Sequence, residues 1–227
     1  MFNFFESASK NNLFKFTALA IIVIAMCLAI QPAFAAVILS GNGALGDFSG
    51  SLAYNPVSST SASITISLTN TSPVANGGFL TAFVFNNPSN LITGITGTSF
   101  SDTDFELIAL NNDNIGASPY GDFDLGSGLT GSFLGGGNPN SGIAVNQSET
   151  FIFYLTGNNL NALNELSFVN ETSDGSNAFF LARFRGFEND GSDKVPGRTS
   201  SPEPASLTLL GLGLLGIWKF GKKGKKN

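Results

Sequence analysis

The chain contains no histidine, and it has a single cysteine, Cys27. Without histidine there can be no Ser-His-Asp triad, no Cys-His pair and no imidazole zinc site. Charged residues make up only 12% of the 227 residues, a length that suits one or two domains. These absences exclude several common kinds of enzyme before any motif is considered.

Basic residues are almost missing from the middle of the chain. Residues 36–182 contain no Lys or Arg, and residues 36–201 hold 14 acidic and 4 basic residues, a net charge of −10. Nucleic-acid binding depends on cationic contacts to phosphates, so nucleic acid is excluded as a partner. An acidic exterior suits an extracytoplasmic protein or one that gathers divalent cations.

The first 35 residues have the pattern of a secretory signal peptide. Lysines precede an apolar run over residues 16–30, and Ala33-Phe34-Ala35 then supplies a small-x-small cleavage sequence. We expect signal peptidase to cut between Ala35 and Ala36. An uncleaved N-terminal anchor is the alternative, but a membrane span needs about 20 apolar residues and this run is shorter.

Removal of this segment would leave a body without sulfur. Cys27 and both methionines, Met1 and Met26, all lie within residues 1–35. The mature body could then form no disulfide bond, and its core alone would have to stabilise it. That body has no Trp and 15 Phe, so we expect Phe to fill most of the core.

Three segments follow one another at the C-terminal end. Pro202-Glu203-Pro204 comes first, and residues 205–218 are then apolar apart from one Ser and one Thr. We expect a membrane helix over about 205–220, although such a short run spans roughly 21 Å of a hydrocarbon core of about 30 Å. An amphipathic surface helix is the alternative, but the run carries no charges to make a polar face. The lysines that would hold the C-terminus inside are Lys219, Lys222, Lys223, Lys225 and Lys226.

This C-terminal arrangement resembles the PEP-CTERM sorting signal of exported bacterial proteins, over residues 202–227. The resemblance implies processing by an exosortase, a membrane-embedded cysteine peptidase that cuts near the motif. It also implies an inner-membrane-anchored precursor whose body is passed to the cell surface or to extracellular polysaccharide. The basic tail is all Lys here, where the family is usually Arg-rich, and the apolar segment is short.

The body between the two ends alternates apolar and polar residues with period two, most clearly over residues 61–69. This pattern predicts an all-β fold, a single antiparallel β-sandwich of jelly-roll-like form over 36–189. A flexible linker is expected over 190–201, a long Gly-rich loop over 111–142 and a hint of helix over 159–166. The expected strands cover residues 36–39, 51–54, 61–69, 78–85, 105–110, 143–146, 150–156 and 179–187.

Three acidic residues, Asp102, Asp104 and Glu106, are spaced two apart. On a strand they would share one face, and carboxylate oxygens are the ligands that calcium prefers. The spacing therefore suggests a calcium site, and calcium is the one cofactor that the sequence suggests. A solvated acidic face is the alternative. Asp122 and Asp124, in the Gly-rich segment, form a second candidate.

The whole sequence favours an exported, non-enzymatic structural or interaction protein of the cell surface or extracellular matrix. A calcium-assisted carbohydrate-binding module on the same fold is the alternative. Glycoside hydrolysis ranks third. It needs two carboxylates about 5–10 Å apart across a cleft, and 14 acidic residues always offer some pair at that distance, so the sequence gives almost no signal for it. The expected partners are signal peptidase, an exosortase, the membrane through the C-terminal helix and extracellular polysaccharide.

Overall fold

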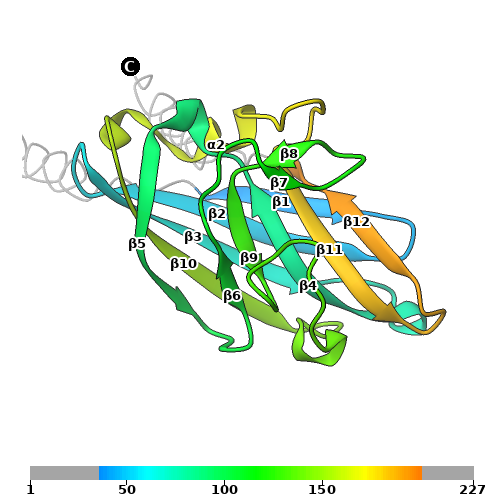
Figure 1. Ribbon diagram of the computed structural model, residues 1–227. Helices are drawn as coiled ribbons and strands as arrows, with labels where there is room; N and C mark the ends of the chain where they lie inside the picture. The colour runs from blue at the N-terminus through cyan, green and yellow to red at the C-terminus, as the bar shows by residue number, and fades with distance from the viewer. Residues whose placement is uncertain (1–35, 201–227) are drawn as a thin grey trace, which may run out of the picture. The chain divides into compact units, whose positions relative to one another are not determined.

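Alternating apolar and polar residues fold most of this chain into antiparallel strands. The computed structural model describes residues 36–200, which form two large sheets and a two-stranded ribbon (Figure 1). The strands of the first sheet are, in spatial order, β13 (Arg198–Ser200), β1 (Val37–Asn42), β2 (Asp47–Pro56), β3 (Ser61–Asn70), β10 (Ser148–Gly157) and β5 (Ile92–Phe100). Those of the second sheet are β12 (Ser192–Pro196), β11 (Phe180–Phe187), β4 (Gly77–Phe85), β9 (Leu125–Gly128) and β6 (Glu106–Ile108). The ribbon pairs β7 (Ile115–Gly116) with β8 (Asp122–Phe123).

The two sheets face each other across a core rich in phenylalanine. The ring centre of Phe83 on β4 lies 4.8 Å from that of Phe151 on β10. The rings of Phe48 on β2 and Phe180 on β11 are 5.6 Å apart. Both contacts join one sheet to the other, and all four rings are buried. The expectation that Phe fills the core is confirmed.

The strongest alternating pattern gives the most regular strand. Along β3, buried and half-exposed residues alternate over all ten positions. The expected strands near 78–85, 150–156 and 179–187 are confirmed as β4, β10 and β11. The prediction of an all-β, antiparallel fold is therefore confirmed, while the finer likeness to a jelly roll stays a prediction.

A flexible linker was expected over 190–201, but residues 190–200, its described part, largely form strands instead. Residues 192–196 form β12 beside β11, and residues 198–200 form β13 beside β1. Gly197 lies between them, where the chain crosses from the second sheet to the first. Its backbone N–H donates to Phe180 O at 2.8 Å, and a Cβ at this position would come within 2.9 Å of Phe180 Cβ. The sandwich therefore extends to the last described residue.

The segment 111–142 is more ordered than the loop that its glycines predicted. It contains β7, β8 and β9, and it covers the outer face of the second sheet. There Phe123 and Phe133 pack with Val84 and Leu181 in a second, smaller core. The sheet is thus buried on both faces, which a period-two pattern in a single strand does not reveal.

Two arginines on the outer face of β11 bind the glycine-rich loop over residues 131–137. Arg183 donates hydrogen bonds to the backbone oxygens of Phe133 and Gly135, both at 2.9 Å. Arg185 donates to Gly135 O at 3.4 Å and also to Gly136 O. Burial lowers the pKa of Arg183, with a further contribution from the charge on Arg185. The loop is therefore held to the sheet through its backbone oxygens.

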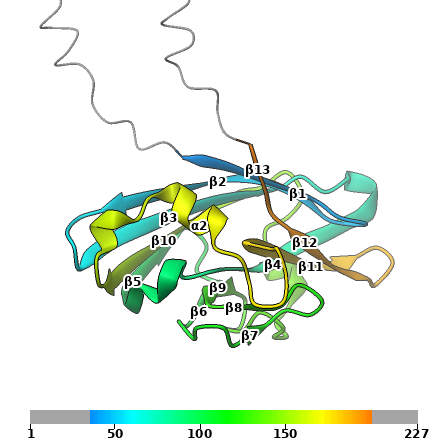
Figure 2. The same ribbon diagram turned by 90° about the horizontal axis from the view of Figure 1, so that it is seen from above.

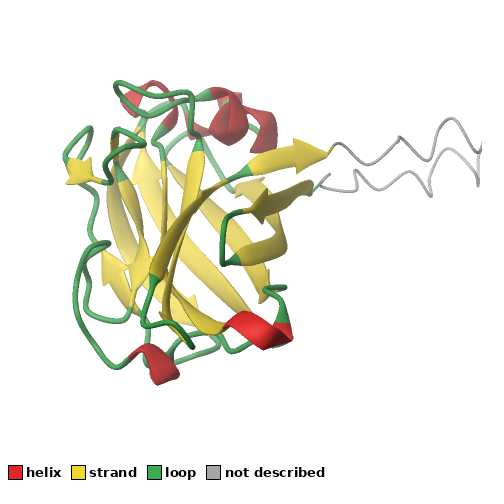
Figure 3. Ribbon diagram, turned by 90° about the vertical axis from the view of Figure 1, so that its right-hand side faces the viewer, coloured by secondary structure: helices red, strands yellow, loops and turns green. Residues whose placement is uncertain are grey.

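Short helices lie at the two ends of the strands (Figure 3). They are η1 (Val74–Asn76), η2 (Pro88–Asn90), η3 (Pro139–Ser141), η4 (Leu160–Ala162) and α2 (Glu165–Asn170). The hint of helix over 159–166 resolves into η4 and the start of α2, which Asn164 and Ser167 cap reciprocally. The expected strand over 143–146 is wrong, because Ile143 forms only an isolated bridge with Leu80.

The hydroxyl of Tyr54 donates to Leu160 O at 2.8 Å and so ties η4 to β2. Burial raises the pKa of Tyr54 to about 12, so the hydroxyl keeps its proton at physiological pH.

The expected signal helix within 1–35 and the expected membrane helix near 205–220 both lie outside the described residues. Within residues 36–200, no helix has the length and apolar character needed to cross a membrane.

Candidate functional site

The three acids proposed as calcium ligands do not share a strand face. Asp102 and Asp104 lie in the turn after β5, and Glu106 is the first residue of β6. The chain turns here because β5 belongs to the first sheet and β6 to the second. One oxygen of Asp102 accepts the backbone N–H of Asp104 at 2.9 Å, which fixes the turn. Within residues 36–200 no three acidic or sulfur side chains form a group that could hold a metal ion.

The second acidic candidate proves to be a buried structural residue. Asp124 is only 3% exposed, and its carboxylate accepts backbone N–H groups from Asn87 at 2.6 Å and from Asp113 at 2.5 Å. Burial raises the pKa of Asp124 above its ordinary value, while the two hydrogen bonds act in the opposite direction. Asp122 lies nearby on β8 and is only partly buried. Asp124 therefore joins two loops at one end of the sandwich.

Asn87 completes this polar arrangement, and the sequence analysis did not identify it as a structural residue. Its amide oxygen accepts Ile92 N–H and its amide nitrogen donates to Ile92 O, both at 2.9 Å. The side chain thus replaces a strand partner for the first residue of β5. The sequence does contain a signal for this turn, because an Asn directly before a Pro, as in Asn87-Pro88, is typical of turns.

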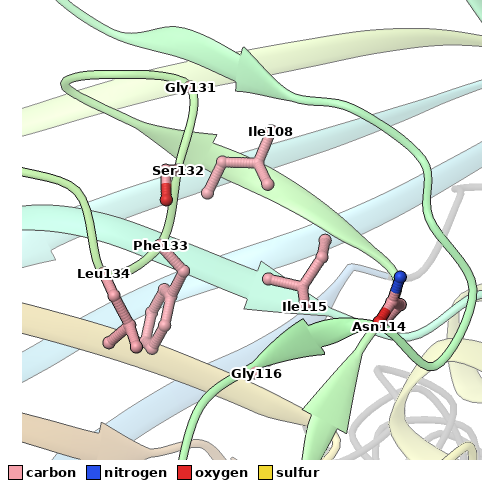
Figure 4. A pocket seen from close by; sticks show the side chains of 8 residues that line it. All are labelled: Ile108, Asn114, Ile115, Gly116, Gly131, Ser132, Phe133 and Leu134. Carbon is pink, nitrogen blue, oxygen red and sulfur yellow. The ribbon is translucent and has the colours of Figure 1, made fainter.

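Two adjoining hollows lie on the outer face of the second sheet, where the β7–β8 ribbon meets the glycine-rich loop. The first has a volume of about 330 Å³ and the second about 350 Å³, and Gly116 and Leu134 line both. Figure 4 shows Ile108, Ile115 and Phe133 around the first hollow, together with Leu134. The only ionisable side chain among the described lining residues is Asp122, in the second hollow. Glycoside hydrolysis uses two carboxylates, so neither hollow offers that chemistry.

The two ends of the described chain lie beside each other at one edge of the first sheet (Figure 2). β1 and β13 are antiparallel, with Ile38 opposite Ser200 and Ser40 opposite Arg198. The expected signal cleavage site, between Ala35 and Ala36, is immediately before β1. The motif Pro202-Glu203-Pro204 begins just two residues after β13 ends. Both expected processing positions therefore flank one pair of strands.

A family model for the PEP-CTERM protein-sorting motif matches residues 202–223. The chain carries a PEP-CTERM protein-sorting motif at its C-terminal end. The match begins at Pro202, includes Glu203 and Pro204 and extends through the apolar run as far as Lys223. Of the five tail lysines, Lys225 and Lys226 lie beyond the match, and the whole motif lies outside the described residues. A search of the curated proteins found no match to the chain.

The sorting motif supports an exported PEP-CTERM protein with a membrane-anchored precursor, and it implies processing by an exosortase, a membrane protein. It covers only the tail, so the role of the β-sandwich has to be argued from the domain itself.

Proposed function

We propose that this PEP-CTERM protein is a structural or interaction protein of the cell surface or extracellular matrix. Signal peptidase would remove residues 1–35, so that Ala36 becomes the N-terminus. The C-terminal helix would hold the precursor in the inner membrane. An exosortase would then act at Pro202-Glu203-Pro204 and pass the sandwich to the cell surface or to extracellular polysaccharide. The observation that carries this proposal is the sorting motif, which follows the last strand after a single residue.

The lysines of the tail would set the position of the motif during processing. Moving five lysines across a bilayer is expensive, so Lys219, Lys222 and the lysines after them would stay on the cytoplasmic side. The motif lies at the other end of the short apolar run. It would then be close to the outer face of the inner membrane.

The composition of the sandwich supports a non-enzymatic role. The chain has no His to act as a general base. The buried carboxylate of Asp124 is engaged by backbone N–H groups in a structural contact. The larger surface hollows are lined mainly by apolar and uncharged groups. These features suit a structural or binding domain rather than an enzyme.

The test is to replace Pro202, Glu203 and Pro204 together by Ala in the producing cells. Export should remain intact, but release should stop, so that uncleaved protein accumulates in the membrane. A matched control replaces three exposed residues of the turn between β2 and β3, 57–59, by Ala and should be processed normally. If the motif variant is shed at the wild-type rate and size, the tail is merely an anchor and the proposal is wrong.

A further inference from the structure

The sorting motif is not on a free linker, because β13 holds the chain to the sheet up to Ser200. Only Ser201 separates this last paired residue from Pro202. At about 3.3–3.6 Å per extended residue, the motif can start no more than roughly 7 Å from the Cα of Ser200. Any peptidase that acts at the motif therefore meets the edge of a folded sheet immediately upstream.

A peptidase cleft has to enclose several residues of its substrate in an extended form. Folded segments are cut through their locally opened state, whose population sets the rate when opening and closing are fast. While β13 is paired, the backbone on one of its sides is engaged by β1 and the rest of the first sheet. A cleft cannot surround residues 198–200 until they leave that partner.

β13 is built to leave its partner at little cost. It has three residues, all paired with β1 alone, and the side chains of Arg198 and Thr199 are exposed. Its departure would break a few backbone hydrogen bonds at a sheet edge, where water can replace them. No buried side chain of Arg198 or Thr199 would have to be withdrawn from the core.

β12 sets the limit of this release. Val195 on β12 is fully buried in the main core, and the strand pairs with β11 over five residues. Gly197, between the two strands, is held by its hydrogen bond to Phe180 O. Opening should therefore stop at Gly197, which would extend the free chain before Pro202 to roughly 17 Å.

We propose that β13 is a releasable strand that controls access of the exosortase to the sorting motif. Paired with β1, it protects the residues before Pro202; detached, it supplies the extended segment that enters the peptidase. The partner of this surface is thus the membrane peptidase itself. This inference rests on the proposed function, because it concerns the regulation of the same processing step.

The test is a reversible lock between β1 and β13. Ser40 and Arg198 are cross-strand partners and both are exposed, so Ser40→Cys with Arg198→Cys places two thiols outside the core. Partner Cα atoms in antiparallel strands lie about 4.5–5.5 Å apart, within the range of about 4.4–6.8 Å that a disulfide spans. The body has no other Cys after residue 35, so no competing disulfide can form within it.

The control lock joins strands that need not separate. Asn55 and Ser63 are partners on β2 and β3, and the pair Asn55→Cys with Ser63→Cys closes a disulfide in the same sheet. Each precursor is incubated in membranes that contain the peptidase, with and without reductant, and the shift in size is followed over time. Recovery after reduction of the same sample shows that the locked protein was folded.

We expect the oxidised β1–β13 lock to slow processing by on the order of tenfold or more, since cleavage follows the population of the opened strand. Reduction should restore the wild-type rate, and the control lock should not change it. If the oxidised lock is processed as fast as the control lock, while the motif variant with three alanines is not processed, this inference fails and the proposed function stands. If the motif variant is processed like wild type, the proposed function fails.

Discussion

Phe83 is the residue whose truncation should cost the sandwich most. It is fully buried, and its ring lies 4.8 Å from Phe151 and 5.6 Å from Phe180, with Phe85 and Phe153 within 6.4 Å. Phe→Ala in a core typically costs about 3–5 kcal/mol, partly from the cavity that remains. Four ring contacts across and along the sheets would be lost at once, so we expect Phe83→Ala near the top of that range.

The assay is thermal unfolding of the exported protein followed by circular dichroism. For a domain of this size about 1 kcal/mol shifts the melting temperature by about 2–4 °C, so a cost of about 5 kcal/mol for Phe83→Ala should lower it by roughly 10–20 °C. Leu134→Ala is the control, because this Leu is 52% exposed and its loss should change stability by less than about 0.5 kcal/mol. A loss for Phe83→Ala no larger than that of the control would refute the assignment of Phe83 to the centre of the core.

Three further predictions concern charged residues. Arg183→Met should cost roughly 1–3 kcal/mol and speed amide hydrogen exchange in the glycine-rich loop, because two charged hydrogen bonds are lost; unchanged exchange would contradict the role given to Arg183. Burial favours the protonated form of Asp124, so its contribution to stability is greatest below its ordinary pKa of 3.8 and is lost as pH rises through the raised pKa. Chemical denaturation from pH 3 to 7 should therefore show wild type losing stability relative to Asp124→Asn as pH rises, and a constant difference would be inconsistent with this. Millimolar calcium should leave the melting temperature unchanged, and a rise that disappears in the triple variant Asp102→Asn, Asp104→Asn, Glu106→Gln would restore the calcium site.

The strands that could be predicted from sequence are those whose two faces differ. In β3 every half-exposed position holds Ser or Thr. The buried positions hold the hydrophobic residues of the strand, which face the core, and Asn70 at its end. β4, β10 and β11 were also recognisable, because they are dense in β-branched and aromatic residues. These patterns lie within each strand's own sequence, so the strand can be predicted without knowing which strands it pairs with.

The strands that were missed owe their existence to pairing. β5 is rich in Thr and Gly and lies at the edge of the first sheet, where only β10 holds it. β12 and β13 read as a polar linker, because most of their side chains are not buried and only Val195 enters the core. β12 pairs with β11 across a short turn, so its place depends on that neighbouring strand. The partner of β13 is β1, which is distant in sequence, and no local pattern indicates that these two segments meet.

The candidate sites show the same division. The sorting motif was legible because its three parts are contiguous in sequence, and the family match confirms it. The acidic trio was placed on a strand because spacing alone cannot reveal that the chain changes sheets between Asp102 and Glu106. The pairing of β13 with β1 could not be predicted from the sequence, because it depends on the two ends of the body meeting at one edge of the first sheet.

The intact mass of the protein recovered from the medium and from the membranes of the producing cells tests the central claim most directly. The account predicts that the released protein begins at Ala36 and ends near Pro202-Glu203-Pro204, without the lysine tail. The membrane fraction should contain a precursor that begins at Ala36 and still carries Lys219 to Lys226. Released protein whose mass includes the whole tail would contradict sorting by cleavage at the motif.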